Sequence, residues 1–328
     1  MIPAWIYALG IAVFVLGSAY GVREQVKGLL GFSDTAMALG AAGGKPTIWW
    51  YVDDSQVNAR EWLDWGNRST REPNEPYLKL CQARALALWG DSFTITPVIG
   101  RPAAILLLQE AKVDIPPEVM RAPPALWMSW CRAAFLSARG GLWLDGSVLP
   151  LSSGSGVELR DRCIGKDALT FGTDPDEGLS DTKGSLAAAG HTAGWAATPG
   201  HPVWRGLLRD VSALIAEGAQ SWSAPEARRS MRYLWDKHCS GTVAVDRKAE
   251  VSRDQYGRRL ELETLLGETD WPTGSTEGGL WVPLPEGRDG LERASPFLWF
   301  TRMSVDQIRE SEFNWARWAT KILNPSMR

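Results

Sequence analysis

The stretch from Gly140 to Leu149, Gly-Gly-Leu-Trp-Leu-Asp-Gly-Ser-Val-Leu, constrains the fold of this chain more than any other. A predicted helix precedes it, because Pro123 and Pro124 suit a helix start and apolar residues recur at helical spacing after them. Gly140 is the residue type that ends a helix in the left-handed conformation. The residues from Leu142 to Leu149 then have the apolar pattern of a buried strand. A helix that leads through a glycine into a buried strand indicates the α/β class.

Asp145 is the one charged residue in that apolar run. An isolated buried carboxylate costs too much free energy to persist, so Asp145 must be paired, bound to a metal, or placed at the exposed end of the strand. In open α/β sheets, ligands bind beyond the carboxyl ends of the strands. We therefore predict that Asp145 lies at a ligand-binding edge.

Other segments alternate between strand and helix patterns. Residues Thr47 to Val52 are β-branched and aromatic, as expected of a first strand, and Asp53 follows them directly. Pro76 opens a predicted helix that Gly90 ends. Two further strands are predicted, at 93–98 and 168–172. Four further helices are predicted: 101–111, an apolar-striped helix from Val203 to Ile215, one from the 223–226 capping box to 237, and a last one from the Ser304–Gln307 capping box to Leu323.

The composition excludes some classes of partner. With 328 residues, the chain has room for one large domain or two small ones. A formal net charge of -3, with no array of basic and aromatic residues, argues against a nucleic-acid partner. The 4 cysteines lack zinc-binding spacing. The 18 tryptophans suit either packing in the core or stacking against sugars, and the sequence leaves both interpretations open.

The amino-terminal segment has the character of a membrane anchor. Residues 2–22 carry no charged side chain, and this stretch is long enough to span a bilayer. We predict a transmembrane anchor over 1–22, a juxtamembrane linker over 23–44 and a globular domain over 45–328. A cleaved signal peptide is the alternative, but no basic residue precedes the apolar run. Arg23 and Lys27 follow it, so the positive-inside tendency predicts a single-pass membrane protein whose domain is cytoplasmic.

Two blocks of sequence resemble a known family. A helix carrying Arg132, followed by Gly-Gly-x-Trp-x-Asp145-x-Ser147, resembles the glycosyltransferase family 32-like and capsular-polysaccharide-synthesis glycosyltransferases. The block from Gly194 to Pro202, with its Pro-Gly-His-Pro, resembles a second family block, although Trp195 replaces the usual Asn. The resemblance implies a GT-A-type, Rossmann-like mixed sheet flanked by helices, and a nucleotide-sugar donor with Mn²⁺ or Mg²⁺. Ser147 stands where many family members have a second Asp, and Ser129 stands where they often have an Asp.

The resemblance also implies roles for residues of the metal and donor site. Asp145 would bind the cation on the donor diphosphate, and Ser147 would reach that cation through a water. Arg132 would either pair with Asp145 or hold the donor sugar. Trp49 and Asp53, at the end of the first strand, would lie near the nucleoside base. A solvated turn or a helix cap is the alternative for Asp53.

Two later loops complete the predicted site. Asp174 and Asp176 lie in an acidic loop after a strand and are candidates for the carboxylate that faces the sugar, the alternative being a solvated turn. Ser275 and Trp281, with Glu277, suit a mobile lid whose tryptophan closes on a ligand, the alternative being an ordinary hairpin loop. The resemblance implies that this lid would meet the metal and the diphosphate.

These observations and the resemblance favour a membrane-anchored glycosyltransferase that moves a hexose to a polysaccharide or glycolipid acceptor. The resemblance further implies retention of configuration at the anomeric carbon. The missing second carboxylate supports a different class: a glycosyltransferase fold retained as an inactive structural or interaction subunit of a membrane assembly. A glycan-binding module without chemistry is a third possibility.

The last helix either packs on the domain or lies against a membrane surface.

Overall fold

The computed structural model describes residues 45–52, 76–151, 155–164, 168–171, 194–218, 222, 224–239, 242–246, 261–268, 279–282, 284 and 297–320. The chain divides into two units, Met1–Lys45 and Pro46–Arg328. The predicted anchor (1–22) and linker (23–44) lie outside the described residues. Within the residues that are described, no helix is both long enough and apolar enough to cross a membrane.

A mixed β-sheet forms the centre of the second unit. Among the described residues it has six strands in the order β2-β1-β3-β6-β5-β7. Strand β6 runs antiparallel to both of its neighbours, whereas β1 pairs in parallel with β2 and β3, and β5 pairs in parallel with β7. The strands are β1 (Thr47–Val52), β2 (Thr94–Ile99), β3 (Gly141–Asp145), β5 (Ala168–Phe171), β6 (Gly194–Ala197) and β7 (Ala244–Asp246).

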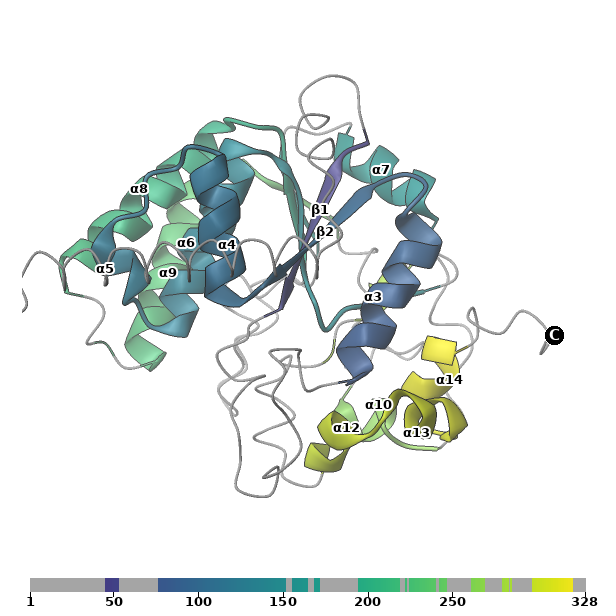
Figure 1. Ribbon diagram of the computed structural model, residues 1–328. Helices are drawn as coiled ribbons and strands as arrows, with labels where there is room; N and C mark the ends of the chain where they lie inside the picture. The colour runs from purple at the N-terminus through teal and green to yellow at the C-terminus, as the bar shows by residue number, and fades with distance from the viewer. Residues whose placement is uncertain are drawn as a thin grey trace, which may run out of the picture. The chain divides into compact units, whose positions relative to one another are not determined.

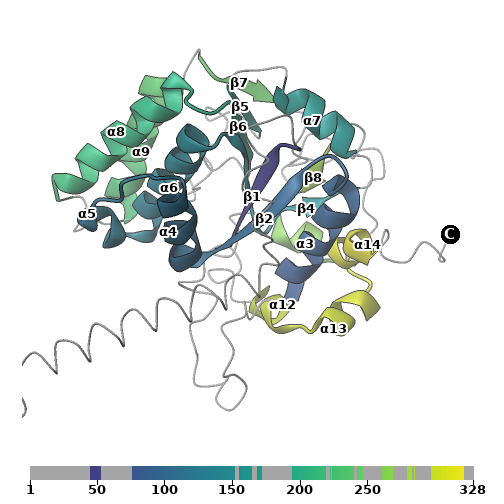
Figure 2. The same ribbon diagram turned by 45° about the horizontal axis from the view of Figure 1, so that its top comes forward.

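Helices cover both faces of this sheet (Figure 1). One group comprises α4 (Gly100–Glu110), α5 (Pro117–Met120), α6 (Pro124–Ala138), α8 (Pro202–Ala216) and α9 (Ala224–Cys239). The other comprises α3 (Pro76–Trp89), α7 (Gly156–Ile164), α12 (Leu298–Arg302), α13 (Val305–Glu310) and α14 (Asn314–Thr320). Figure 2, turned by 45°, shows the same separation of the two groups. The protein is therefore a mixed α/β fold with a sheet flanked by helices, compatible with a Rossmann-like architecture.

The alternation of side chains along β1 assigns one face to each helix group. Ile48, Trp50 and Val52 belong to the buried cluster that includes the α3 residues Cys81 and Trp89. Trp49 faces the other way and lies 4.9 Å from Phe135 of α6, measured between ring centroids. Successive strand residues point to opposite faces, so both faces of β1 are buried. This explains why the strand is apolar throughout rather than alternating.

Strands β2 and β3 lie on opposite sides of β1, so the chain reverses the direction in which it adds strands to the sheet. From β1 the chain crosses through α3 to β2 on one side, and then returns through α4 and α6 to β3 on the other side of β1. In doubly wound sheets with this local order, ligands bind at the carboxyl ends of β1 and β3. In this fold, the end of β3, where Asp145 lies, is therefore the expected ligand-binding position.

The local signals in the sequence are confirmed at several helix ends. Gly140 has a φ of +64° at the end of α6, as a left-handed helix stop requires. His201 caps α8 by accepting a hydrogen bond on Nδ1 from the Val203 N–H at 3.3 Å. The Ser304–Gln307 capping box is present in full at the start of α13.

Two predicted elements are divided in the structure. The predicted strand from Leu142 to Leu149 is wrong, because the chain turns at Gly146 and resumes as β4 (Leu149–Pro150). Strand β4 pairs with β8 (Trp281–Val282) in a small antiparallel sheet of its own. The predicted single helix from Ser304 to Leu323 is also wrong, because it breaks at 311–313 into α13 and α14.

The break between α13 and α14 has a local cause. Ser311 caps α13 in an extended conformation, and its Oγ donates to the Gln307 carbonyl at 2.6 Å. The Asn314 side chain then donates to the Thr264 carbonyl, which ties α14 to α10 (Leu262–Leu265). Trp315 is 1% exposed and packs in the core, so of the two expectations for the carboxyl-terminal segment, packing on the domain is the one confirmed for α14.

Candidate functional site

The carboxyl ends of β1 and β3 form the edge at which the candidate site lies. Tyr51 of β1 and Asp145 of β3 are register partners in the parallel ladder. The backbone of Gly146 continues this pairing, because its N–H donates to the Tyr51 carbonyl at 2.6 Å. Asp145 is partly exposed here, whereas the three residues before it are buried. The sheet thus ends in a partly exposed carboxylate, as the sequence predicts for a ligand-binding edge.

A tight turn fixes the orientation of the Asp145 side chain. Its Oδ1 accepts hydrogen bonds from the Ser147 N–H at 2.8 Å and from the Ser147 Oγ at 2.7 Å. Gly146 makes the turn possible, since an added Cβ would lie 2.5 Å from Val52 Cγ2 and 2.8 Å from the Tyr51 carbonyl oxygen. Ser147 itself is buried, so its hydroxyl serves first to hold the carboxylate.

Cys81 lies beneath this turn. Its Sγ donates to the Ser147 carbonyl at 3.8 Å, and its side chain is completely buried in α3. Burial raises the pKa of the Cys81 thiol well above its usual range, with Arg84 opposing the shift and Asp145 adding to it. A thiol with so high a pKa is a poor nucleophile, so Cys81 supports the turn and does not supply chemistry.

Arg132 approaches the same edge from α6. Its guanidinium carbon lies 3.9 Å from the centroid of the Trp195 ring, and the residue is 6% exposed. Burial lowers the pKa of Arg132 to about 10, against the attraction of Asp145, which is the largest opposing influence. The guanidinium therefore stays charged at neutral pH, with Asp145 as the strongest negative charge acting on it.

Aromatic rings fill the space between this edge and the helices. Tyr51 and Trp143 stack with their centroids 4.9 Å apart and their planes at 26°. Trp195 packs against Trp204 at 5.0 Å and against Trp235 at 4.4 Å. All five rings are less than 8% exposed. Of the two roles left open for tryptophan, these rings take core packing.

Of the predicted site residues, the structure brings Asp145 and Ser147 into contact, and the Asp145 charge acts on Arg132. Trp49 lies apart from them, because its Nε1 donates to the Gly140 carbonyl at 2.8 Å, toward the opposite end of β3. That position suits packing between β1 and α6 rather than contact with a nucleoside base at the carboxyl edge. Trp281 also lies apart from them.

Trp281 does not have the surroundings of a lid residue. It is fully buried in β8, where it pairs with Pro150 and packs edge-on against Trp89 at 6.1 Å and Phe171 at 5.0 Å. The expectation of a tryptophan that closes over a ligand is corrected accordingly, because the cross-strand pairing and the ring contacts hold Trp281 in the core. Asp53, Asp174, Asp176 and Ser275 lie outside the described residues.

The oxygen atoms at the edge suit a hard cation only in part. Carboxylate and hydroxyl oxygens are ligands that Mg²⁺ and Mn²⁺ prefer. Within the part of the chain that the structure describes, however, no group of three His, Cys, Asp or Glu side chains could hold a metal ion. One carboxylate with a serine beside it fits a cation that a phosphate-bearing ligand brings with it, rather than a cation held by the protein alone.

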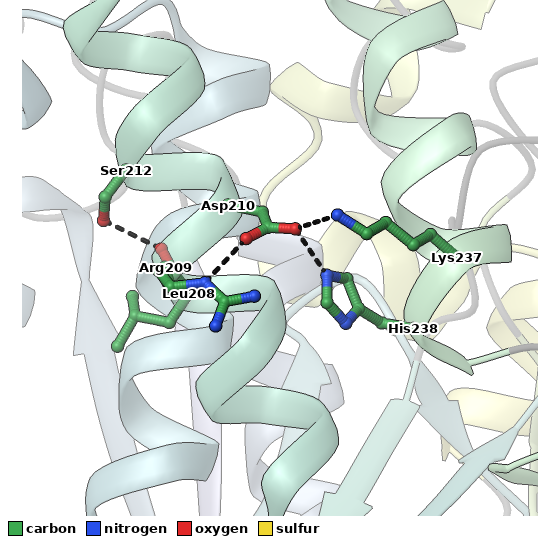
Figure 3. Close-up of polar contacts among 6 residues, drawn as sticks. All are labelled: Leu208, Arg209, Asp210, Ser212, Lys237 and His238. Atoms are coloured by element: carbon green, nitrogen blue, oxygen red, sulfur yellow. Dashed lines mark hydrogen bonds and ion pairs between the residues drawn. The ribbon is translucent and has the colours of Figure 1, made fainter.

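A second cluster of charges lies on the outer helices. Asp210 of α8 accepts from Lys237 at 2.6 Å and contacts His238 Nε2 at 2.9 Å, both from the end of α9 (Figure 3). Lys237, together with His238 and the neighbouring Arg209, holds the pKa of Asp210 well below its usual range despite partial desolvation. The Asp210 carboxylate thus joins α8 to the end of α9 through two side chains, Lys237 and His238.

The contact of Trp195 with Arg132 was not predicted from the sequence. The one available signal was the tryptophan at the start of a strand where the resembled family usually has Asn. Comparisons of the chain with protein-family models, with curated proteins and with solved structures find no match.

Proposed function

We propose that this protein is a membrane-anchored glycosyltransferase of GT-A type that moves a hexose from a nucleotide-sugar donor to a polysaccharide or glycolipid acceptor. The observation that carries the proposal is the position of Asp145 at the carboxyl end of β3, beside β1, where the strand order reverses. The Arg132-to-Ser147 motif that suggested the family lies at this point of the fold. Retention at the anomeric carbon comes with the family resemblance.

Each of the three residues at the edge has a distinct part in this proposal. Asp145 presents a carboxylate whose Oδ1 is fixed by Ser147, so the side chain needs little reorganisation to meet a ligand. Arg132 supplies a buried positive charge behind that carboxylate. Departure of the nucleoside diphosphate develops negative charge, and a divalent cation shared by Asp145 and the phosphates would neutralise it.

Ligand binding by the full chain in detergent tests the proposal. A ligand present at about 100 times its Kd stabilises the folded state by about 2.7 kcal/mol. We therefore expect a nucleotide-sugar with Mn²⁺ to raise the Tm by about 5 °C. Asp145→Asn should abolish that rise. Asp306→Asn, which alters an exposed ion pair on α13, is the matched control and should leave it unchanged. If no donor in a full panel raises the Tm of the wild-type chain, the enzymatic proposal fails.

One observation favours a second candidate, an inactive subunit of a membrane assembly. Where a second carboxylate would serve the metal, Ser147 is buried and uses its hydroxyl to hold Asp145. In that case Asp145→Asn should restore function to cells that lack the gene as fully as the wild-type chain does. A phenotype as severe as that of the deletion, with normal protein levels, would exclude the inactive subunit and support the enzyme.

A further inference from the structure

Arg132 and Trp195 form a buried cation–π pair. The guanidinium carbon lies 3.9 Å from the ring centroid, and the two residues are 6% and 4% exposed. Because both residues are buried and the ring covers one side of the guanidinium, little of the Arg132 surface is open to a donor sugar. The surroundings of Trp195 therefore decide what Arg132 can reach.

Two other rings and the neighbouring strand hold Trp195 in place. Trp204 of α8 and Trp235 of α9 have their centroids at 5.0 Å and 4.4 Å from it. Trp143 of β3 is its register partner in the antiparallel ladder. Movement of the Trp195 ring would have to disturb two helices and the sheet, so Arg132 stays covered.

The same ladder places Asp145 on the side of the sheet where Trp195 lies. Asp145 follows Trp143 by two residues in β3, and residues two apart on a strand point to the same face. Trp195 lies directly opposite Trp143 on the neighbouring strand, so its ring shares that face. Arg132 enters from α6 on this side, and Asp145 is the largest negative influence on its charge.

We infer that Trp195 is a positioning residue: it holds the guanidinium of Arg132 toward Asp145, and so fixes the carboxylate, instead of leaving Arg132 to bind the donor. This role deepens the proposed function and rests on it, because the carboxylate that Arg132 fixes is the one that would meet the donor's phosphates. It assigns to Arg132 one of the two roles that the sequence left open.

The Ser147 amide reports the position of Asp145 without any ligand. Its N–H donates to Asp145 Oδ1 at 2.8 Å, so its hydrogen-exchange rate measures how often that bond opens. We expect Trp195→Leu to speed exchange at Ser147 in the full chain about tenfold, the change that loss of a desolvated cation–π contact would produce. Trp195→Phe keeps an aromatic face and should stay within about threefold of the wild type.

Trp127→Leu is the matched control. Trp127 is also a buried tryptophan beside an arginine, since the Arg101 guanidinium carbon lies 5.1 Å from its ring centroid. Its ring stacks on Trp130 within α6, with the centroids 6.0 Å apart, rather than on the Arg132 side chain. A general loss of core packing would speed exchange at Ser147 equally in both leucine variants. Faster exchange at Ser147 in Trp195→Leu, but not in Trp127→Leu, separates positioning from packing.

Arg132→Met provides a second variant, because it keeps Trp195 and removes the charge. It should reproduce the faster exchange at Ser147, and it keeps the inference testable if Trp195→Leu does not fold. Unchanged exchange in Arg132→Met, or equal effects of Trp195→Leu and Trp127→Leu, would overturn the inference.

Binding of Mn²⁺ with a nucleoside diphosphate separates this inference from the proposed function. Where the wild type binds both, Trp195→Leu should weaken Mn²⁺ binding about tenfold by the same reasoning. If the wild type binds neither and the exchange results hold, the positioning role stands and the proposed enzyme fails. If the wild type binds and Trp195→Leu binds equally well, the enzyme stands and the positioning role fails.

Discussion

At the scale of single residues, Gly146 decides whether the Asp145 turn can exist. The turn brings its Cα so close to β1 that any side chain would collide with Val52 and with the Tyr51 carbonyl. The same approach allows the Gly146 N–H to continue the ladder and lets Ser147 reach back to the carboxylate. Backbone proximity, rather than a left-handed φ, is the reason for glycine at this position.

Gly146→Ala should therefore destabilise the fold by crowding, at a cost of about 2 kcal/mol, within the range for overpacked sites. Gly218→Ala is the informative control, because Gly218 has a φ of +98° but no atom within 4 Å of an added Cβ. Its cost, from the backbone conformation alone, should be about 1 kcal/mol. Urea unfolding of both variants measures the difference, and a smaller loss for Gly146→Ala than for Gly218→Ala would contradict this explanation.

Much of the candidate site could be predicted from the local sequence, and some of it could not. Asp145 stands out as a charge in an apolar run, and Gly140 marks the helix end before it. The contact between Arg132 and Trp195 joins residues 63 positions apart (132 and 195), and no local pattern encodes it. The core position of Trp281 depends likewise on its pairing with Pro150, so its sequence context alone suggested a loop.

At the scale of elements, the Asp210 cluster joins the end of α9 to the middle of α8. Gly206 makes room for this contact, because an added Cβ would lie 2.9 Å from the His238 ring. Trp235, one turn before Cys239 on α9, packs on Trp195. The charges and the rings together fix α9 over the side of the sheet where Arg132 lies.

Acid should weaken this attachment. The pKa of Asp210 is lower in the folded chain than in an unfolded one, so the folded state binds fewer protons and stability falls as the pH drops below the ordinary aspartate value of about 3.9. Above that pH the contribution is fully present. The ion pairs are partly exposed, so Asp210→Asn should cost only about 1 kcal/mol at pH 7.

Urea midpoints measured against pH check this prediction. The wild type and Asp210→Asn should differ at pH 7 and converge as the pH falls well below 4, in the window where Asp210 takes up its proton. Asp306→Asn, whose ion pair with Arg309 is exposed at 3.6 Å, should track the wild type throughout. A difference between wild type and Asp210→Asn that stays constant with pH would show that charge is not the cause.

At the scale of the whole molecule, Arg84 connects three regions of the chain. It is 1% exposed within α3, and it donates through Nε to the Pro150 carbonyl at 2.8 Å and through Nη1 to the Ala319 carbonyl at 3.2 Å. Local patterns predicted β1, β2, β5 and several helix ends, because caps and apolar periodicity act over a few residues. The bond from Arg84 to Ala319 spans 235 residues, and such contacts arise only from the assembled fold.

Arg84→Met should accordingly reduce the free energy of unfolding by about 3 kcal/mol, because it leaves two buried carbonyls without their donor. Arg101→Met is the matched control: Arg101 also donates to two carbonyls, of Met120 and Ala122, but in more exposed surroundings where water can replace it. We expect that variant to lose about 1 kcal/mol. Urea unfolding gives both values, and equal losses would mean that burial of the Arg84 bonds adds nothing. Because Arg84 acts on the assembly of α3, β4 and α14 rather than on Asp145, folded Arg84→Met protein should retain wild-type binding of any nucleotide-sugar that the parent chain binds.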